Sequence, residues 1–421
     1  MDEQLLQHIW QHQLYYSQDL HTTKGKHVEI INPGTLNKDA GPDFYCSQIM
    51  IGDIKWHGCV EIHKKASDWN AHKHSEDKMY NSVVLHVVAD YDCDIYNSEG
   101  AEIPALVLNF NPKITKNYQQ LYESNLWVAC EKSFNIIDPF LLSIWLESLI
   151  IERLERKSVN ILKILSENQN NYNETFYQML SLNLGFKTNA APFEIVSRQL
   201  KLQTLKKFAD DILKVEAAIF GMAGFLENQP VDEYQSTLKR EFEVLKNRFS
   251  LTPVEQTMWK FFRMRPTNFP TQRLAQLSSI IANSTDFVGL LLNIKDLNEL
   301  TEHFRKPVSD YWQNHINFGK KSSKKHYSLG KESINNILIN TVVPFLFVYG
   351  LKHGDEELKN KALSWLENIE TEDNQIIRKW QTLTTIENAK QSQAFLELKN
   401  EYCTNKRCLQ CRIGSRIVAE V

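Results

Sequence analysis

The pattern of apolar and polar positions divides the chain into a strand-rich beginning and a helical remainder. Apolar residues at near-helical spacing predict an amphipathic helix within the first 20 residues. Alternating or continuous apolar runs then predict strands, each bounded by Gly, Pro or polar residues, over 27–34, 44–51, 54–63 and 82–90. Ser67 is placed to cap a helix running through Trp69 to about Tyr80. A β-hairpin is expected over residues 91–112.

This order of elements predicts an α+β protein. Residues 1–112 are expected to form a compact mixed α/β domain, followed by a linker over 113–134. From residue 135 the apolar spacing becomes helical and prolines punctuate it, so residues 135–421 are expected to form a large all-α region that ends in a cysteine cluster.

Composition limits the partners of the chain. The 421 residues are 42% hydrophobic and 24% charged, which suits a globular protein with two or three cores. A net charge of -3 excludes a general polyanion binder, so contact with nucleic acid would need a local basic patch.

Membrane and export signals are not expected. The N-terminal residues lack the basic and apolar regions of a secretory signal. The apolar run 337–351 is interrupted by Asn340 and Pro344, which argues against a membrane span. Seven cysteines, an odd number, predict a reduced, cytoplasmic setting.

Candidate chemistry is concentrated between residues 41 and 88. Side chains at i and i+2 of a strand share a face, so Glu61 and His63 are expected to point the same way. If the strand that follows Asp43 lies beside them, the two carboxylates converge. Together with the backbone carbonyl of Ile62, they would offer an oxygen-rich site for Mg²⁺ or Mn²⁺.

Structural roles are alternatives for each of these residues. Asp43 could be a turn residue and Glu61 could lie on an exposed strand face. His72 and His74 do not share a helical face, so a surface or capping role competes with a metal-binding one. A purely structural role is expected for three further residues: Asp68 as a partner of the helix dipole, Asp77 as a solvated helix residue and His86 as a core histidine.

Pro42-Asp43, followed by Glu61-Ile62-His63, resembles the motif of the PD-(D/E)XK phosphodiesterase superfamily. The order helix, three strands, helix, strand is also similar to the core of that superfamily. The resemblance implies a restriction-endonuclease-like fold and a metal-dependent nuclease in which Asp43 and Glu61 bind metal. His63 stands where the family has Lys, and it would orient or deprotonate water.

Two other functions remain open. One is an inactive, nucleic-acid-binding or scaffold protein that keeps the nuclease fold. The other is a different metallohydrolase that uses the His-rich stretch with a transition metal. Over most of its length, the chain also resembles an uncharacterised bacterial family with no assigned activity, through GPDF, VEIH, SDWNAHKH, VVLHVV, FGMAG, RMRPTNFPTQR and the C-terminal cysteines.

Cys403, Cys408 and Cys411 form a second candidate site. Their C-x4-C-x2-C spacing suits Zn²⁺ or an iron–sulfur cluster, with Cys130 or His326 as the fourth ligand. Some superfamily nucleases carry such a cluster on three C-terminal cysteines and one remote cysteine. The alternative is that these are small buried residues of a terminal helix.

Two basic segments are candidates for nucleic-acid contact. Arg263, Arg265 and Arg273 alternate with aromatic residues, a combination that suits phosphates and unstacked bases. In the alternative, the aromatics fill a core and the arginines cap a loop. The lysines over 320–325 are expected to form a solvated loop.

Overall fold

A computed structural model of the chain describes residues 2–322 and 328–420. Its contacts divide the chain into two compact units, the first made of residues 1–146 and 396–421 and the second of residues 147–395. The first unit therefore extends past the predicted boundary at residue 112 and includes the C-terminal cysteines. Lys324 and Lys325 of the predicted basic loop, and His326, a candidate fourth ligand of the cysteine site, lie outside the described residues.

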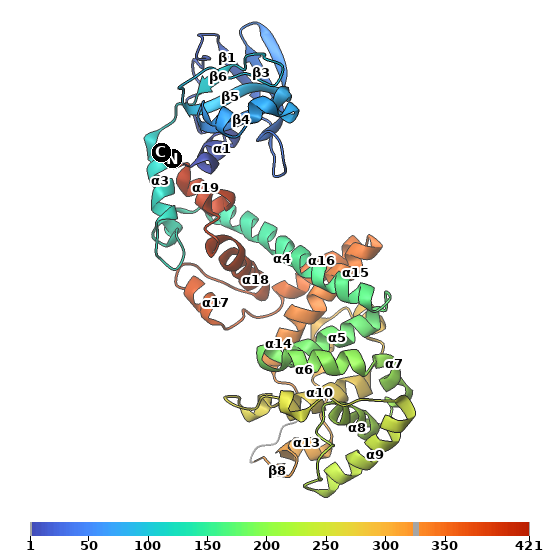
Figure 1. The fold of residues 1–421 in the computed structure, drawn as a ribbon. Helices are drawn as coiled ribbons and strands as arrows, with labels where there is room; N and C mark the ends of the chain where they lie inside the picture. Colours follow the sequence, from blue (N-terminus) through green and yellow to red (C-terminus); the bar gives the residue numbers. More distant parts are fainter. Residues whose placement is uncertain (1, 323–327, 421) are drawn as a thin grey trace. The chain divides into compact units, whose positions relative to one another are not determined.

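The first unit contains a mixed sheet (Figure 1). Its strands are β1 (Val28–Asn32), β2 (Thr35–Leu36), β3 (Phe44–Ile51), β4 (Ile54–Lys65), β5 (Val83–Asp90) and β6 (Ala105–Val107). The strand order is β1-β3-β4-β5-β6, and β2 pairs with β3. The pairs among β1, β3 and β4 are antiparallel, whereas β5 runs parallel to both β4 and β6. The predicted mixed α/β beginning is confirmed.

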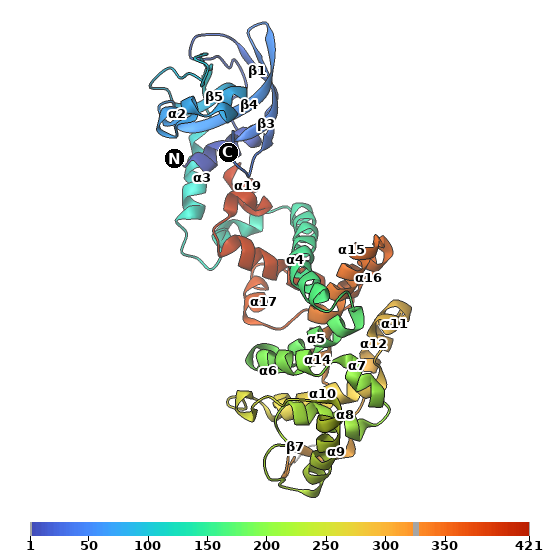
Figure 2. The same ribbon diagram turned by 45° about the vertical axis from the view of Figure 1, so that its right-hand side comes forward.

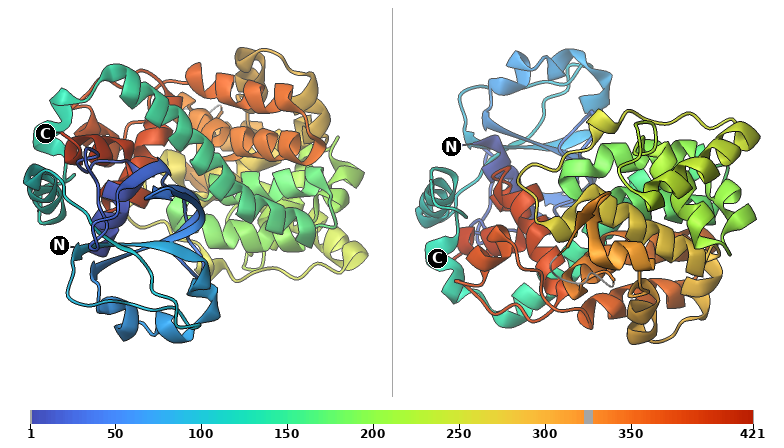
Figure 3. Two further views of the ribbon diagram at one scale, coloured as in Figure 1. Left: turned by 90° about the horizontal axis from the view of Figure 1, so that it is seen from above. Right: turned by 90° about the horizontal axis from the view of Figure 1, so that it is seen from below.

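The helices of the first unit are α1 (Glu3–Gln11), α2 (Asp68–Ala71), α3 (Pro112–Tyr122) and α19 (Arg412–Val418). Helices α1 and α2 both pack against β4, and Figure 3 shows them from two further directions. Helix α19 lies beside α3 (Figure 2), where the side chain of Asn117 donates to the backbone carbonyls of Ile417 and Glu420. The C-terminal helix is thus joined to the helix that follows the sheet, within one unit.

Two local predictions are wrong in extent. The helix capped at Ser67 ends at Ala71 instead of Tyr80, because Lys73 adopts a left-handed conformation with φ of 62°. Two short 3₁₀ helices follow, η1 (His74–Glu76) and η2 (Lys78–Ser82). The hairpin expected over residues 91–112 is reduced to one bridge, between Tyr96 and Glu102, and β6 then pairs in parallel with β5.

A bulge in β3 changes its register against β4. Ser47 pairs with Gly58, so an unbroken ladder would carry Asp43 opposite Ile62. Phe44 instead pairs with Val60, which carries Asp43 opposite Glu61. The extra residue lies at Cys46, whose φ is 58°. The bulge therefore decides which residue of β4 faces Asp43.

The second unit is helical. Its helices are α5 (Tyr172–Leu184), α6 (Phe186–Gln199), α7 (Leu202–Leu205), α8 (Ile212–Met222), α9 (Glu233–Phe249), α10 (Pro270–Asn283), α11 (Phe287–Asn293), α12 (Leu297–Phe304), α13 (Asp310–Asn314), α14 (Lys331–Ile337), α15 (Val343–His353), α16 (Glu356–Glu367) and α17 (Gln375–Trp380). Two short strands, β7 (His315–Asn317) and β8 (Lys320–Lys321), pair with each other. The boundaries between the units fall within α4 (Pro139–Glu167) and α18 (Ala389–Glu397).

One helical stretch of this unit, Lys331–His353, is long and apolar enough to cross a membrane by length and composition. It has 23 residues, so it is longer than the apolar run identified from the sequence, and an 18-residue window within it has a mean hydropathy of 1.6. However, 72% of its apolar window is buried inside the protein. This burial favours a core helix.

Candidate metal centre

The candidate site lies where β3 begins and β4 ends. Glu61 and His63 alternate along β4 with Val60 and Ile62, both of which are fully buried. Because successive side chains of a strand point to opposite faces, Glu61 and His63 share the face that carries Trp69 and the β4–β5 connection. Both are nearly inaccessible, with exposed fractions of 5% for Glu61 and 1% for His63.

Asp43 is held beside Glu61. Its backbone N–H donates a hydrogen bond of 2.9 Å to Oε2 of Glu61. Its own carboxylate accepts hydrogen bonds from the backbone N–H of Ile62 at 3.0 Å and from the side-chain amide of Gln7 at 2.8 Å. Burial and the Glu61 carboxylate raise the pKa of Asp43 well above its ordinary value, despite these two donors. The structure thus brings together the two carboxylates that the sequence proposed as metal ligands.

His63 is a buried, neutral imidazole. Burial, reinforced by the neighbouring histidines, lowers its pKa to about 2. Its Nδ1 lies 2.8 Å from Nε2 of His86, which is fully buried in β5. If Nδ1 of His63 carries the proton and donates it to His86, Nε2 of His63 presents a lone pair to the site. The environment of His63 thus differs from that of a permanently charged lysine.

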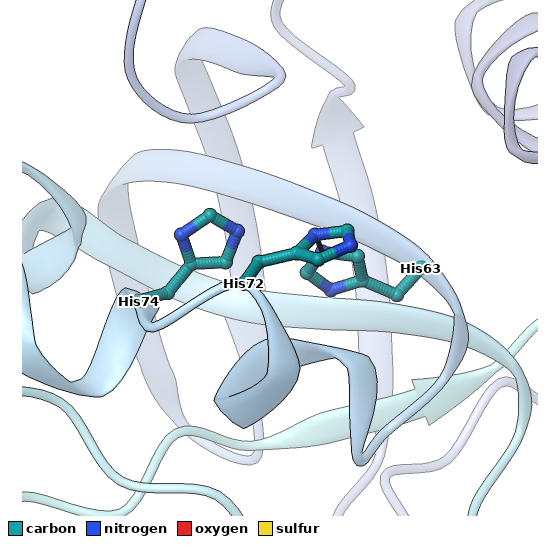
Figure 4. A group of neighbouring side chains, drawn as sticks. All are labelled: His63, His72 and His74. Carbon is teal, nitrogen blue, oxygen red and sulfur yellow. Dashed lines mark hydrogen bonds between the residues drawn. The ribbon is translucent and has the colours of Figure 1, made fainter.

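His72 and His74 come from the connection between β4 and β5 and complete a group of three imidazoles with His63 (Figure 4). One donor atom from each lies within 4.8 Å of the others. Nδ1 of His72 is 3.1 Å from Nε2 of His63. Nε2 of His74 is 3.4 Å from Oε1 of Glu61, and Nε2 of His63 is 3.6 Å from the same oxygen.

The local backbone explains how two histidines that do not share a helical face reach one site. The left-handed conformation of Lys73 ends the helical path between them, so both side chains turn toward β4. The ring of His74 stacks on Tyr80, with 3.7 Å between centroids, and also contacts Trp69. His74 is consequently 8% exposed, whereas His72 is exposed and forms the solvent side of the group.

Helix α1 contributes two residues that the sequence analysis missed. Oε1 of Glu3 lies 3.8 Å from Nε2 of His63, and Gln7 holds the carboxylate of Asp43. Burial raises the pKa of Glu3. Their spacing of i and i+4 puts them on one face of α1, a signal visible in the sequence. It could not be used there, because nothing indicated which end of α1 meets β4.

Of the three residues expected to have purely structural roles, Asp68 and Asp77 bond to nearby backbone, whereas His86 also contacts the site. Asp77 caps η2 by accepting from the backbone N–H of Met79, and Asp68 accepts from the backbone N–H of Lys65. His86 is a core histidine, but it is also the partner of His63. Its Nδ1 has no hydrogen-bond partner among the described residues.

The donor set is richer in nitrogen than the oxygen-rich site predicted from the sequence. Three imidazoles stand with Glu61, while Asp43 and Glu3 lie at the margins of the group. Imidazole nitrogen suits Zn²⁺, Fe²⁺ and other later transition ions, whereas Mg²⁺ is usually bound through oxygen and Mn²⁺ accepts imidazole more readily than Mg²⁺ does. Of the two ions expected from the sequence, these residues fit Mn²⁺ better than Mg²⁺.

The arginines proposed for nucleic-acid contact lie in the second unit and differ in exposure. Arg263 and Arg265 are exposed. Arg273 is 3% exposed, and its guanidinium donates to Asn268, Gln276 and Ser333. Burial lowers the pKa of Arg273 to about 10. Its contacts are therefore internal, and contact with nucleic acid stays a prediction.

The three C-terminal cysteines lie together in the first unit. Cys403, Cys408 and Cys411 line one cavity with Cys130, which was one of the two candidates for a fourth ligand. None of the seven cysteines forms a disulfide.

The comparisons with known proteins identify a family but no activity. A family model described as "Protein of unknown function (DUF2851)" matches residues 3–375. No curated protein and no solved structure matches the chain. The matched residues include the whole candidate site. They end before the three C-terminal cysteines, to which the likeness to an uncharacterised family was expected to extend.

Proposed function

We propose that this chain, which belongs to the DUF2851 family of proteins of unknown function, is a metal-dependent phosphodiesterase that acts on nucleic acid. The observation that carries the proposal is the grouping of three imidazoles with the Glu61 carboxylate at one end of β4, where Asp43 is held beside Glu61. Two carboxylates and three imidazoles gathered at one site, where Glu61, His63 and His74 are nearly inaccessible, are best explained by a divalent cation.

The topology supports a nuclease-like fold. The three longer antiparallel strands, β1, β3 and β4, are followed by a helical crossover and a parallel strand, which is the element order of the superfamily that the motif resembles. Asp43 precedes the second of the antiparallel strands and Glu61-Ile62-His63 lies on the third, as the motif implies. A restriction-endonuclease-like domain is therefore part of the proposal.

The residues of the site are proposed to have two kinds of role, metal binding and positioning of the metal ligands. Glu61, His63 and His74 would hold the metal, with His72 on the solvent side and Asp43 as a further carboxylate ligand. A divalent ion bound there polarises a phosphodiester and lowers the pKa of an attacking water. His86 fixes the ring of His63, and Gln7 fixes Asp43.

Access for a polyanion is provided by neighbouring lysines. Lys65 follows His63 on the same face of β4, and Lys73 stands between His72 and His74; both side chains are exposed. Cations beside a metal site attract phosphate and orient it without reading sequence. This arrangement supports nucleic acid as the substrate class.

An inactive binding protein is the second candidate, and His63 is the observation that favours it. The superfamily motif places a lysine cation at this position, whereas His63 is buried, neutral and engaged with His86. Such a protein would bind nucleic acid without cleaving it.

The deciding experiment is a cleavage assay with the full chain. Labelled single- and double-stranded DNA and RNA are incubated with Mn²⁺, Mg²⁺ or Zn²⁺, in parallel with the Glu61→Gln variant. We expect Mn²⁺-dependent cleavage that falls by more than about 100-fold in Glu61→Gln. Glu76→Gln is the matched control, because Glu76 is an exposed acid of the same connection. Binding without cleavage under every metal would support the inactive protein and overturn the enzyme.

A further inference from the structure

Four cysteines that lie far apart in the sequence line a single small cavity of the first unit. Cys130 follows α3 and precedes η3 (Glu131–Ile136). The other three are at the C-terminal end: Cys403 closes η8 (Leu398–Cys403), Cys408 opens η9 (Cys408–Gln410) and Cys411 precedes α19. The cavity is separate from the site on β4 and shares no residue with it.

The backbone of the C-terminal segment is folded tightly around this cavity. Lys406 has a φ of 51°, and the backbone N–H of Arg407 donates to the carbonyl of Tyr402. The backbone N–H of Cys411 lies 3.1 Å from the carbonyl of Arg407. A Cβ at Gly414 would lie 2.2 Å from the carbonyl oxygen of Cys408, so only glycine fits there. These turns direct three thiols toward the segment that carries Cys130.

The thiols affect one another electrostatically. Burial, with Cys411 and Cys408 as further causes, raises the pKa of Cys130 to about 12. Burial also raises the pKa of Cys403, with Cys130 and Cys411 as the next causes. Arg407 lines the same cavity, and its guanidinium lies 4.6 Å from the ring centre of Tyr402. The cavity thus gathers one buried and three partly buried thiols beside a cation, and thiolate is the form in which cysteine binds a metal.

We propose that Cys130, Cys403, Cys408 and Cys411 hold one thiophilic metal centre, either a zinc ion or an iron–sulfur cluster. Both take four thiolates. The proposal goes beyond the phosphodiesterase and does not depend on it. It also assigns the fourth ligand that spacing left open, since Cys130 lies in the cavity.

The spacing of the sulfurs favours the cluster. Zinc–sulfur bonds of about 2.3 Å in a tetrahedron put the four sulfurs about 3.8 Å apart. In the described part of the chain, no three of these cysteine sulfurs all lie within 4.8 Å of one another. The sulfurs are therefore further apart than a single zinc ion requires. A polynuclear centre holds its thiolates further apart than a single ion does, so it requires less movement of the two segments.

The centre would tie the two ends of the first unit together. Cys130 follows the end of α3, and Cys411 immediately precedes α19. Oγ of Ser415 in α19 lies 3.3 Å from Nε2 of His8 in α1. A bond network between these segments stabilises the folded state, because metal affinity adds to the free energy of unfolding.

The test is metal analysis of the full chain purified under anaerobic conditions from cells supplied with iron and zinc. We expect either iron with an equal amount of acid-labile sulfide and a visible absorption that bleaches on reduction, or about one zinc per chain. Cys130→Ser and Cys411→Ser should each lower this content at least 10-fold. Cys93→Ser is the matched control, because Cys93 is a partly buried cysteine elsewhere in the same unit.

A second measurement protects the test against variants that fail to fold. Chelation of the wild-type protein should lower its melting temperature and make the four thiols reactive toward a disulfide reagent. A wild-type protein that contains neither iron nor zinc overturns the proposal. So does a folded Cys130→Ser variant with the full metal content. Glu61→Gln should leave this centre unchanged, which separates its failure from that of the site on β4.

Discussion

The backbone N–H of Asp43 donates a hydrogen bond of 2.9 Å to Oε2 of Glu61, although 18 positions separate the two residues. In return, the carboxylate of Asp43 accepts from the backbone N–H of Ile62, the residue after Glu61. Each carboxylate is therefore held by the backbone that carries the other. This reciprocal arrangement fixes two like charges side by side before any cation arrives, which is the preorganisation that a metal site requires.

Replacing Asp43 should stabilise the metal-free protein. Burial and Glu61 raise the pKa of Asp43, so its ionisation costs folded-state stability as the pH rises through that raised pKa. Asp43→Asn removes this cost, and we expect the free energy of unfolding to rise by on the order of 1–3 kcal/mol at pH 8 and to change little at pH 4. Denaturant unfolding in chelator at both pH values measures it, with the exposed Asp53→Asn as control.

If Mn²⁺ binds at the proposed site, it should stabilise the wild-type protein, and the same Asp43→Asn variant should lose this stabilisation. A rise in melting temperature with added Mn²⁺ that is equal in both proteins would show that Asp43 is not a ligand.

His86 is expected to act through His63. His86→Leu removes the partner of Nδ1 of His63, together with a buried nitrogen that has no partner among the described residues. We expect Mn²⁺ affinity to fall by about 10- to 100-fold, and the metal-free protein to lose about 1–3 kcal/mol of stability because the buried Nδ1 of His63 loses its partner. Isothermal titration with Mn²⁺ measures the affinity. The control is His57→Asn, because His57 is an exposed histidine of β4, the strand that carries His63. Unaltered affinity in His86→Leu would remove His86 from the site.

The bulge at Cys46 should depend on backbone conformation more than on the thiol. Cys46 is exposed and has a φ of 58°, a region that glycine adopts freely and β-branched residues avoid. We expect Cys46→Gly to retain the wild-type melting temperature or exceed it. Cys46→Val should destabilise the protein by about 1–2 kcal/mol. Thermal denaturation distinguishes the two. Equal melting temperatures would argue against strain at the bulge.

Glu216, in the second unit, should make stability depend on pH. It is fully buried in α8, one of its oxygens accepts from the hydroxyl of Tyr234, and burial raises its pKa from 4.5 to about 7. Because the folded pKa is raised, its contribution is present at acidic pH and is lost as the pH rises through 7.

The side chain of the Glu216→Gln variant cannot ionise. The free energy of unfolding of the variant, relative to that of the wild-type protein, should therefore rise between pH 5 and pH 9. The expected shift is about 3 kcal/mol. Any constant cost of the new amide cancels in this difference. A gap that does not change with pH would show that Glu216 titrates normally.

The arginines of the second unit should separate into two classes. Arg273→Ala leaves Asn268, Gln276 and Ser333 without their partner, and we expect a loss of about 2–4 kcal/mol in stability. Arg265→Ala should change stability by less than about 0.5 kcal/mol. If this segment contacts nucleic acid, Arg265→Ala should instead weaken binding and lower the salt-dependence slope by about 1. Fluorescence anisotropy at several salt concentrations measures it.

Periodicity along the chain was enough to predict the mixed sheet and the helical remainder. Strand patterns such as that of β5 are local, because a strand buried on both faces must be apolar throughout. The i and i+2 rule likewise placed Glu61 and His63 on one face of β4. The acid and histidine residues of the candidate site were therefore visible in the sequence.

The composition of the site, in contrast, depended on contacts between distant segments. The offset at Cys46 decided that Asp43 faces Glu61, and one left-handed residue, Lys73, directed His72 and His74 to the same place. No periodic pattern carries a single-residue change of register, since it alters neither hydrophobicity nor spacing.

The amino-acid order alone was sufficient for the element types, the helical second half and the list of groups capable of chemistry, because these follow from side-chain patterns a few residues long. Folding in three dimensions selected among those groups. It put Glu3 and Gln7 beside the β4 site, turned Arg273 inward and placed Cys130 with three cysteines from the other end of the chain. Such selections arise from packing between segments that are far apart in sequence, and local spacing contains no information about them.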